Sequence, residues 1–129
     1  MPILHVYGVP HAEGINPYLR DVVRPRLVRD ILDVVELGLS EPSQVSIFFH
    51  KEDYELGPNR SQREVIAEVR WFLEVEGRRM DAPFHKLADA IGRALGEIFV
   101  RDAVPQIFRV ARVECHVWMA ESSQGYAEY

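Results

Sequence analysis

MPILHVYGV, residues 1–9, is the stretch of sequence from which the fold can be worked out. Residues 2–9 form a short run of apolar, β-branched and aromatic side chains, which predicts a β-strand. Pro2 stands directly after Met1. A proline there gives an edge strand a stiff start. Alternatively, if Met1 is removed, it carries a free secondary amine on a rigid ring. The rest of the sequence has to decide between these two interpretations.

An amphipathic helix is expected after this strand, over roughly residues 17–38. Asn16 is a suitable N-cap with Pro17 in the first helical position, and Gly38 is a natural end. Pro25 removes one backbone donor inside the segment, so the helix should kink or restart there. Apolar residues recur along it in steps of four, at Leu19, Val23, Leu27, Ile31 and Val35.

The chain then repeats this alternation. Residues 44–56 (QVSIFFHKEDYEL) and 65–75 (VIAEVRWFLEV) predict two more strands around the turn cluster GPNRS. A second helix follows, with Asp81 as its N-cap. Its apolar stripe contains Phe84, Leu87, Ala88, Ile91, Leu95 and Ile98.

The fourth predicted strand is RVECHVWM, residues 112–119. Because side chains alternate along a strand, Glu114, His116 and Trp118 share one face. The other face carries Val113, Cys115, Val117 and Met119. Cys115 therefore reads as a small buried hydrophobe rather than a nucleophile.

Two β-α-β units in a row predict an α+β fold. A helical crossover favours a parallel strand pair, so the units most simply share one four-stranded mixed sheet with both helices on one face. We expect a single domain over residues 1–129, with pseudo-repeat halves of about 1–58 and 59–129. The other face of the sheet needs cover, which oligomerisation would supply.

The composition excludes several classes of protein. The chain has 129 residues, of which 47% are hydrophobic and 27% charged, and its net charge is −5. An acidic chain disfavours general nucleic-acid binding. The lone cysteine is typical of a reducing compartment. With neither a signal-like segment nor an apolar run that could cross a bilayer, we expect a soluble cytoplasmic protein with no membrane partner.

These features together resemble the tautomerase superfamily, of the 4-oxalocrotonate tautomerase and macrophage migration inhibitory factor type. The resemblance rests on the Met1-Pro2 start, on the segment FLEVEGRRMDAPFHKLADAI (residues 72–91), and on the aromatic last strand with its tyrosine-rich tail. An EVRWF run at residues 68–72 is most similar to a bacterial branch of uncharacterised function. The resemblance implies a homotrimer whose sheets face the centre.

Pro2 is the candidate catalytic residue. An unperturbed α-amino group has a pKa of about 7.7–8, which an apolar pocket or a nearby cation lowers. By the resemblance, the neutral amine would move a proton between carbon and oxygen of a small keto or enol carboxylic acid. If Met1 stays, the nitrogen is an amide and is not basic.

Arg78 and Arg79 are the candidate substrate-binding cations, because a guanidinium fork matches a carboxylate. The Glu-Gly-Arg pattern before and at Arg78 resembles the dehalogenase members of the superfamily. Val75 stands where those enzymes carry another arginine, which disfavours halide-displacing chemistry. Residues 42–44 lack the carboxylate of the decarboxylase members, so a tautomerase reading is favoured.

Trp118 and His116 are further candidates for substrate binding, although packing at a sheet or subunit contact explains Trp118 equally simply. The histidines form no zinc-binding spacing, so neither a metal nor an organic cofactor is expected. Two strand histidines could meet in space, but nothing in the sequence says so.

Two alternatives to an enzyme remain open. The first is an inactive tautomerase-fold protein that binds a ligand or serves assembly. The second is a ferredoxin-like domain that binds a partner through its sheet, because such domains share the βαββαβ order.

Overall fold

The computed structural model describes residues 2–52, 63–73 and 81–121. Its strands are β1 (Pro2–Val9), β2 (Ser46–Lys51), β3 (Glu64–Leu73) and β4 (Arg112–Glu121). Its α-helices are α1 (Ile15–Tyr18), α2 (Arg24–Leu32) and α3 (Asp81–Gly96). Wider π-helical turns extend two of these, η1 (Leu19–Val23) and η5 (Glu97–Arg101), and short 3₁₀ turns are η2 (Val35–Leu37), η3 (Pro42–Gln44) and η6 (Gln106–Phe108).

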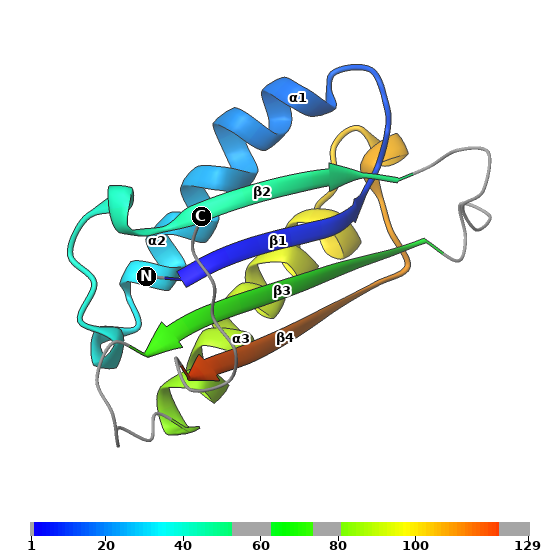
Figure 1. Ribbon diagram of the computed structural model, residues 1–129. Coiled ribbons are helices and arrows are strands. Elements are labelled where there is room, and N and C mark those ends of the chain that lie inside the picture. Colours follow the sequence, from blue (N-terminus) through cyan, green and yellow to red (C-terminus); the bar gives the residue numbers. More distant parts are fainter. Residues whose placement is uncertain (1, 53–62, 74–80, 122–129) are drawn as a thin grey trace, which may run out of the picture.

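The strands form one four-stranded sheet in the order β2-β1-β3-β4 (Figure 1). β1 pairs with β2 and β3 with β4 in parallel, while the central β1–β3 pair is antiparallel. The predicted mixed sheet of two parallel units is therefore confirmed. Because the strands of each unit are direct neighbours, the topology differs from the split β-α-β arrangement of ferredoxin-like domains.

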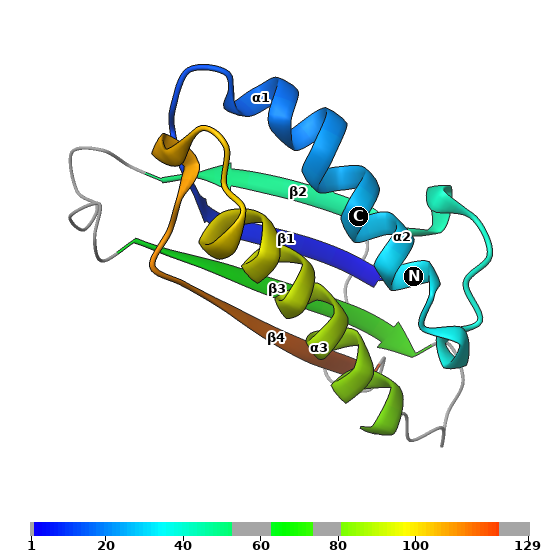
Figure 2. The ribbon, with the colours of Figure 1, turned by 180° about the vertical axis from the view of Figure 1, so that it is seen from behind.

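The helices cover one face of this sheet, as Figure 2 shows from behind. Side chains that alternate along the strands enter the core on that face, among them Leu4 and Val6 of β1 and Val65, Ala67 and Val69 of β3. Leu87, Ile91 and Leu95 of the predicted α3 stripe meet them and are fully buried. The opposite face keeps exposed aromatic side chains, including Tyr7, Phe48 and Trp118.

The first helix begins earlier than its sequence predicts. Gly14, with φ at 83°, precedes Ile15 as the N-cap, so the expected Asn16 cap is wrong. The restart at Pro25 is confirmed: the π-helical turn η1 runs up to Val23, and α2 begins at Arg24. A wider turn avoids the clash of the proline ring with the carbonyl four residues earlier. Gly38 ends the segment with φ at 68°, as expected.

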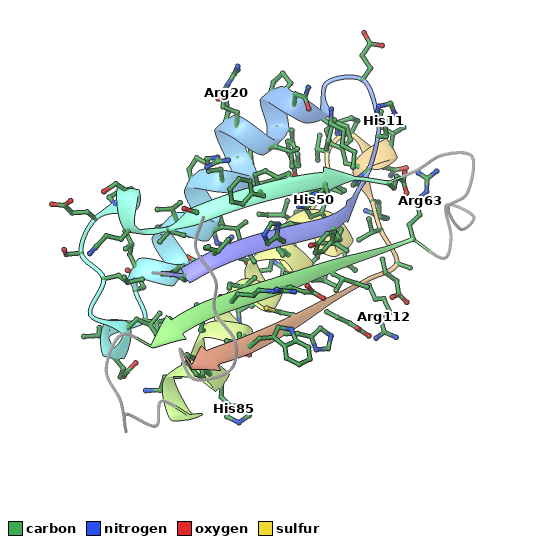
Figure 3. The ribbon with its side chains drawn as sticks, in the orientation of Figure 1. His11, Arg20, His50, Arg63, His85 and Arg112 are labelled. Carbon is green, nitrogen blue, oxygen red and sulfur yellow. The ribbon has the colours of Figure 1, made fainter. Side chains whose placement is uncertain are left out.

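A bulge interrupts β1 near its end, where the pairing with β2 shifts between Tyr7 and Val9. Gly8 lies in this bulge with φ at 79°, and a Cβ there would lie 2.1 Å from the carbonyl oxygen of Glu64. Close by in the sequence, Arg63 (labelled in Figure 3) forms an ion pair with the largely buried Glu52, Nη1 to Oε1 3.0 Å. Backbone contact and charge pairing both hold this end of the sheet together.

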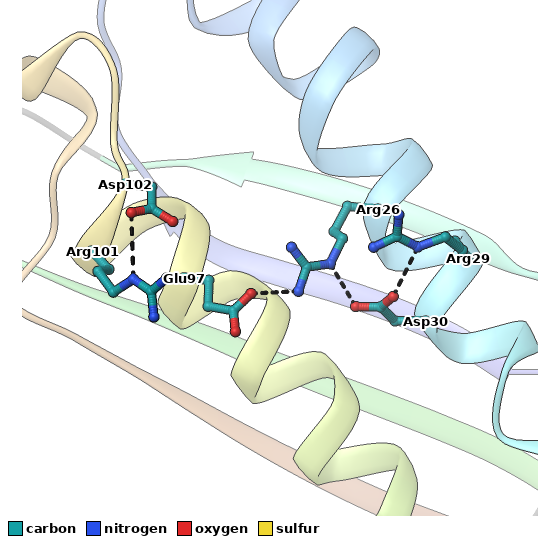
Figure 4. A network of polar contacts seen from close by, with 6 residues as sticks. All are labelled: Arg26, Arg29, Asp30, Glu97, Arg101 and Asp102. Carbon is teal, nitrogen blue, oxygen red and sulfur yellow. Dashed lines mark hydrogen bonds and ion pairs between the residues drawn. The ribbon is translucent and has the colours of Figure 1, made fainter.

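An ion-pair network joins the two helical layers on their outer side (Figure 4). Arg26 of α2 donates to Asp30 Oδ2 at 2.7 Å and reaches Glu97 Oε2 of η5 at 2.5 Å. The hydrogen bond from Arg26 lowers the pKa of the Glu97 carboxyl. The network therefore fixes α2 against the α3–η5 helix at neutral pH.

Among the described helices, none is long and apolar enough to cross a membrane.

Candidate active site

Pro2 is the first residue of β1, a central strand of the sheet, and its side chain is buried. It lies opposite Trp71 of β3 in the antiparallel register. On the other side, Ile3 pairs with Ser46, so Pro2 lies at the level of the buried Val45. Figures 1 and 2 both place this end of β1 beside the end of α2. Pro2 therefore starts a strand that hydrogen-bonded neighbours hold on both sides.

An amine at this position would have unusual surroundings for a chain terminus. Pro2 points to the same face as Leu4 and Val6, which are fully buried beneath the helices. Burial among apolar groups disfavours the charged form of an amine. The strand also fixes the direction of the nitrogen, whereas a lysine amine moves on a flexible stem. These are the physical requirements for a general base that works near neutral pH.

Arg78 and Arg79 lie outside the described residues. They belong to the connection between Leu73, the last residue of β3, and Asp81, the first residue of α3. Leu73 is only two residues beyond Trp71, the partner of Pro2. The predicted anion holders therefore follow the strand end nearest to Pro2 in the sequence, and their role stays a prediction.

Trp118 and His116 are on the edge strand β4, on the sheet face opposite to Pro2. They pair in register with Arg70 and Glu68 of β3, which separates β4 from β1. Two strand spacings amount to about 10 Å. A single chain therefore does not bring these two residues to Pro2.

An open cleft of about 600 Å³ runs between α3 and the edge strand β4. His116 Nε2 lies 3.3 Å from the Glu114 carboxylate, which Arg112 also contacts. The cleft is lined by Phe84, His85, Ala88, Cys115, His116, Val117 and Trp118. His116 and Trp118 thus line a cleft at the edge of the sheet, away from the start of β1.

Cys115 lies in this cleft on the helix-facing side of β4, and burial raises the pKa of its thiol to about 12. Because only the thiolate reacts, its alkylation by iodoacetamide at pH 8 should be about a thousandfold slower than that of an ordinary cysteine. Mass spectrometry of the alkylated protein checks this. The same chain in 6 M guanidinium chloride is the control and should react at the ordinary rate. Equal native and denatured rates would contradict the expected burial.

A cluster of stacked rings lies on the open face of β1 and β2, which sequence reasoning did not identify. His5 stacks on Phe48 with 5.1 Å between ring centroids, and Tyr7 stacks on His50 at 4.5 Å. His5 Nδ1 and His50 Nε2 lie 2.8 Å apart. Strand alternation shows that these residues share a face, but only the pairing register brings the two histidines together.

The surroundings of His5 keep its imidazole neutral. Burial lowers the pKa of His5, the neighbouring His50 and Arg70 lower it further, and Glu68 opposes them. In the described ranges, no three His, Cys, Asp or Glu side chains gather into a group that could hold a metal ion.

Several solved structures have the same fold. Pt0534, in a structure inactivated by 2-oxo-3-pentynoate, matches at a TM-score of 0.64 and 9% identity, over 95% of this chain and 89% of its own. A fused 4-OT, described as an asymmetric trimer, matches at 0.59 and 14%, over 97% and 91%. Malonate semialdehyde decarboxylase matches at 0.53 and 12%, over 98% and 91%. The decarboxylase work includes a variant in which alanine replaces a proline at position one.

No family model matches the sequence, and the search of curated proteins finds no relative. The structural neighbours are members of the tautomerase superfamily, and their likeness at these identities shows the fold. The expected tautomerase-like fold is therefore confirmed.

Proposed function

We propose that this chain is a tautomerase-like enzyme that moves a proton within a small keto or enol carboxylic acid. The observation that carries the proposal is the position of Pro2, buried at the start of a central strand. After removal of Met1, the proline nitrogen is a secondary amine instead of an amide. It then has the fixed direction and the apolar surroundings that a general base needs.

The reaction needs only a proton and a place to hold it. The neutral amine takes a proton from the enol oxygen or from the carbon beside the carbonyl group, and it returns the proton to the other atom. No metal and no organic cofactor take part in these steps. Arg78 and Arg79 hold the substrate carboxylate through their planar guanidinium groups.

The structural neighbours support this choice of base and substrate. Pt0534 is inactivated by 2-oxo-3-pentynoate, which is a small unsaturated keto acid. The proline-to-alanine variant of malonate semialdehyde decarboxylase indicates that a first-residue proline mattered to its investigators. Pro2 of this chain takes the first position once Met1 is removed.

A homotrimer is the second part of the proposal. The face of the sheet away from the helices exposes Tyr7, Phe48 and Trp118, and association would cover them. Trp118 and His116 cannot reach Pro2 of their own chain, so they would bind substrate only across a subunit contact. The trimeric fused 4-OT supports this assembly state.

Native mass spectrometry of the protein purified from cells tests both parts at once. The expected species is a trimer of chains that each lack one methionine residue. A chain that keeps Met1 would rule out the proline amine, whatever its assembly state. A monomer would rule out the trimer without excluding the amine. The ketonisation of phenylenolpyruvate and 2-hydroxymuconate, followed by ultraviolet absorbance, then tests the reaction itself.

An inactive protein of the same fold, serving ligand binding or assembly, is the second candidate. The stacked rings of His5, Tyr7, Phe48 and His50 on the exposed face favour it, because they form a contact surface that needs no catalytic proline. In that case the trimer forms, but no substrate of the keto-enol class is turned over.

A further inference from the structure

His5 and His50 form a pair of imidazoles on neighbouring parallel strands. His50 is opposite Tyr7 in the β1–β2 register, and His5 is opposite Phe48, so the two histidines are diagonal neighbours. Their facing nitrogens, His5 Nδ1 and His50 Nε2, lie 2.8 Å apart. Both side chains lie on the sheet face that no helix covers, where Figure 3 shows His50 over β2 and β1.

We propose that His5 Nδ1 and His50 Nε2 are the two protein ligands of a site for a divalent transition-metal ion, with Cu²⁺ bound most strongly. This site is independent of Pro2 and of the proton transfer proposed above, because Pro2 points to the helix-covered face.

The geometry needs little adjustment to accept an ion. Metal–imidazole bonds are about 2.0–2.1 Å long, so two such nitrogens around a tetrahedral ion lie about 3.3 Å apart. The present separation of 2.8 Å therefore has to open by about half an ångström, which the exposed His50 ring can provide. Stacking on Tyr7 and Phe48 holds the two rings in roughly parallel planes.

The proton balance is simple. In the hydrogen bond, one of the two facing nitrogens carries a hydrogen and the other accepts it. When the ion binds, that hydrogen moves through water to the other nitrogen of the same ring. Both imidazoles then remain neutral and present a lone pair, and no net proton is released. Water completes the coordination, since the site is on the uncovered face of the sheet.

The nature of the ligands selects the class of ion. Imidazole suits copper, zinc and nickel, and a site with nitrogen ligands prefers Cu²⁺ over Zn²⁺ and Ni²⁺. Mg²⁺ and Ca²⁺ demand oxygen ligands and are disfavoured. Glu68 is opposite His5 in the β1–β3 register and attracts a cation, while Arg70, two residues further along β3, repels it. We therefore expect binding of moderate strength.

Titration of the whole protein with Cu²⁺, followed by electron paramagnetic resonance, tests the site. Wild-type protein should bind one ion per chain and show splitting from two equatorial nitrogens. His50→Gln should weaken binding by about tenfold or more and lose one nitrogen. The matched control is His85→Gln, because His85 is exposed on α3 (Figure 3) and should leave the signal unchanged.

Two results would overturn the proposal. One is an unchanged Cu²⁺ affinity in His50→Gln, even if His5→Gln weakens it, because His5 alone could act with the chain terminus. The other is an equal loss in His85→Gln, which indicates non-specific binding to surface histidines. Circular dichroism shows whether each variant is folded. His50→Asn, a smaller amide, replaces any variant that is not.

Discussion

Pro2→Ala is expected to reduce kcat for keto-enol conversion by about 10²-fold or more, with KM nearly unchanged. The alanine keeps an amine at the chain terminus after Met1 is removed. That amine is primary and rotates freely, whereas the proline ring fixes the nitrogen on β1. The loss appears in kcat because the amine acts on the moving proton and does not hold the substrate carboxylate. Stopped-flow absorbance with phenylenolpyruvate measures both constants.

Pro10→Ala is the matched control for this experiment. Pro10 is also buried and directly follows the other end of β1, but it carries no terminal amine. Its replacement should leave kcat within a factor of a few. Equal rates in wild type and Pro2→Ala, with Met1 absent from both, would contradict catalysis by Pro2 and favour the inactive binding protein.

Gly8→Ala should cause the largest loss of stability, about 2–5 kcal/mol of unfolding free energy. Two effects add at this position. The backbone φ of 79° disfavours any side chain, and the new Cβ would lie 2.1 Å from the Glu64 carbonyl oxygen. That oxygen belongs to the first residue of β3, so the neighbouring strand would have to move. Urea denaturation at constant m-value measures the change.

Gly38→Ala separates the two effects. Gly38 also has a positive φ, 68°, but a Cβ there meets nothing within 4 Å. It should therefore show the conformational cost alone, about 1–2 kcal/mol. If Gly8→Ala were no more destabilising than Gly38→Ala, the close approach of β1 and β3 at Gly8 would be wrong.

Part of the candidate site could be predicted because it depends on local sequence. Pro2 at the start of a strand needs only the order Met1-Pro2 and the β-rich run that follows. The faces of β4 follow from strict alternation, and the structure confirms that Cys115 points toward the helices while Trp118 is exposed on the open face. Arg78 and Arg79 lie outside the described residues, so their role stays a prediction.

Other parts depend on which strands become neighbours. The expected grouping of Trp118 and His116 with Pro2 came from resemblance, and the sheet order separates them within one chain. The N-cap at Asn16 was wrong because Gly14 reaches a positive φ that starts the helix earlier. Such details depend on how a loop returns over the core, which short-range preferences do not specify.

The sequence by itself determined the strands, the helices and the side of each strand that faces the core, because these follow from the periodicity of apolar residues and from the positions of glycine and proline. Only the tertiary structure decided the sheet order, the close approach at Gly8 and the contact between His5 and His50. These three depend on the register between strands that are far apart in the chain. That register is set by packing the whole sheet against α2 and α3, so no local segment contains it.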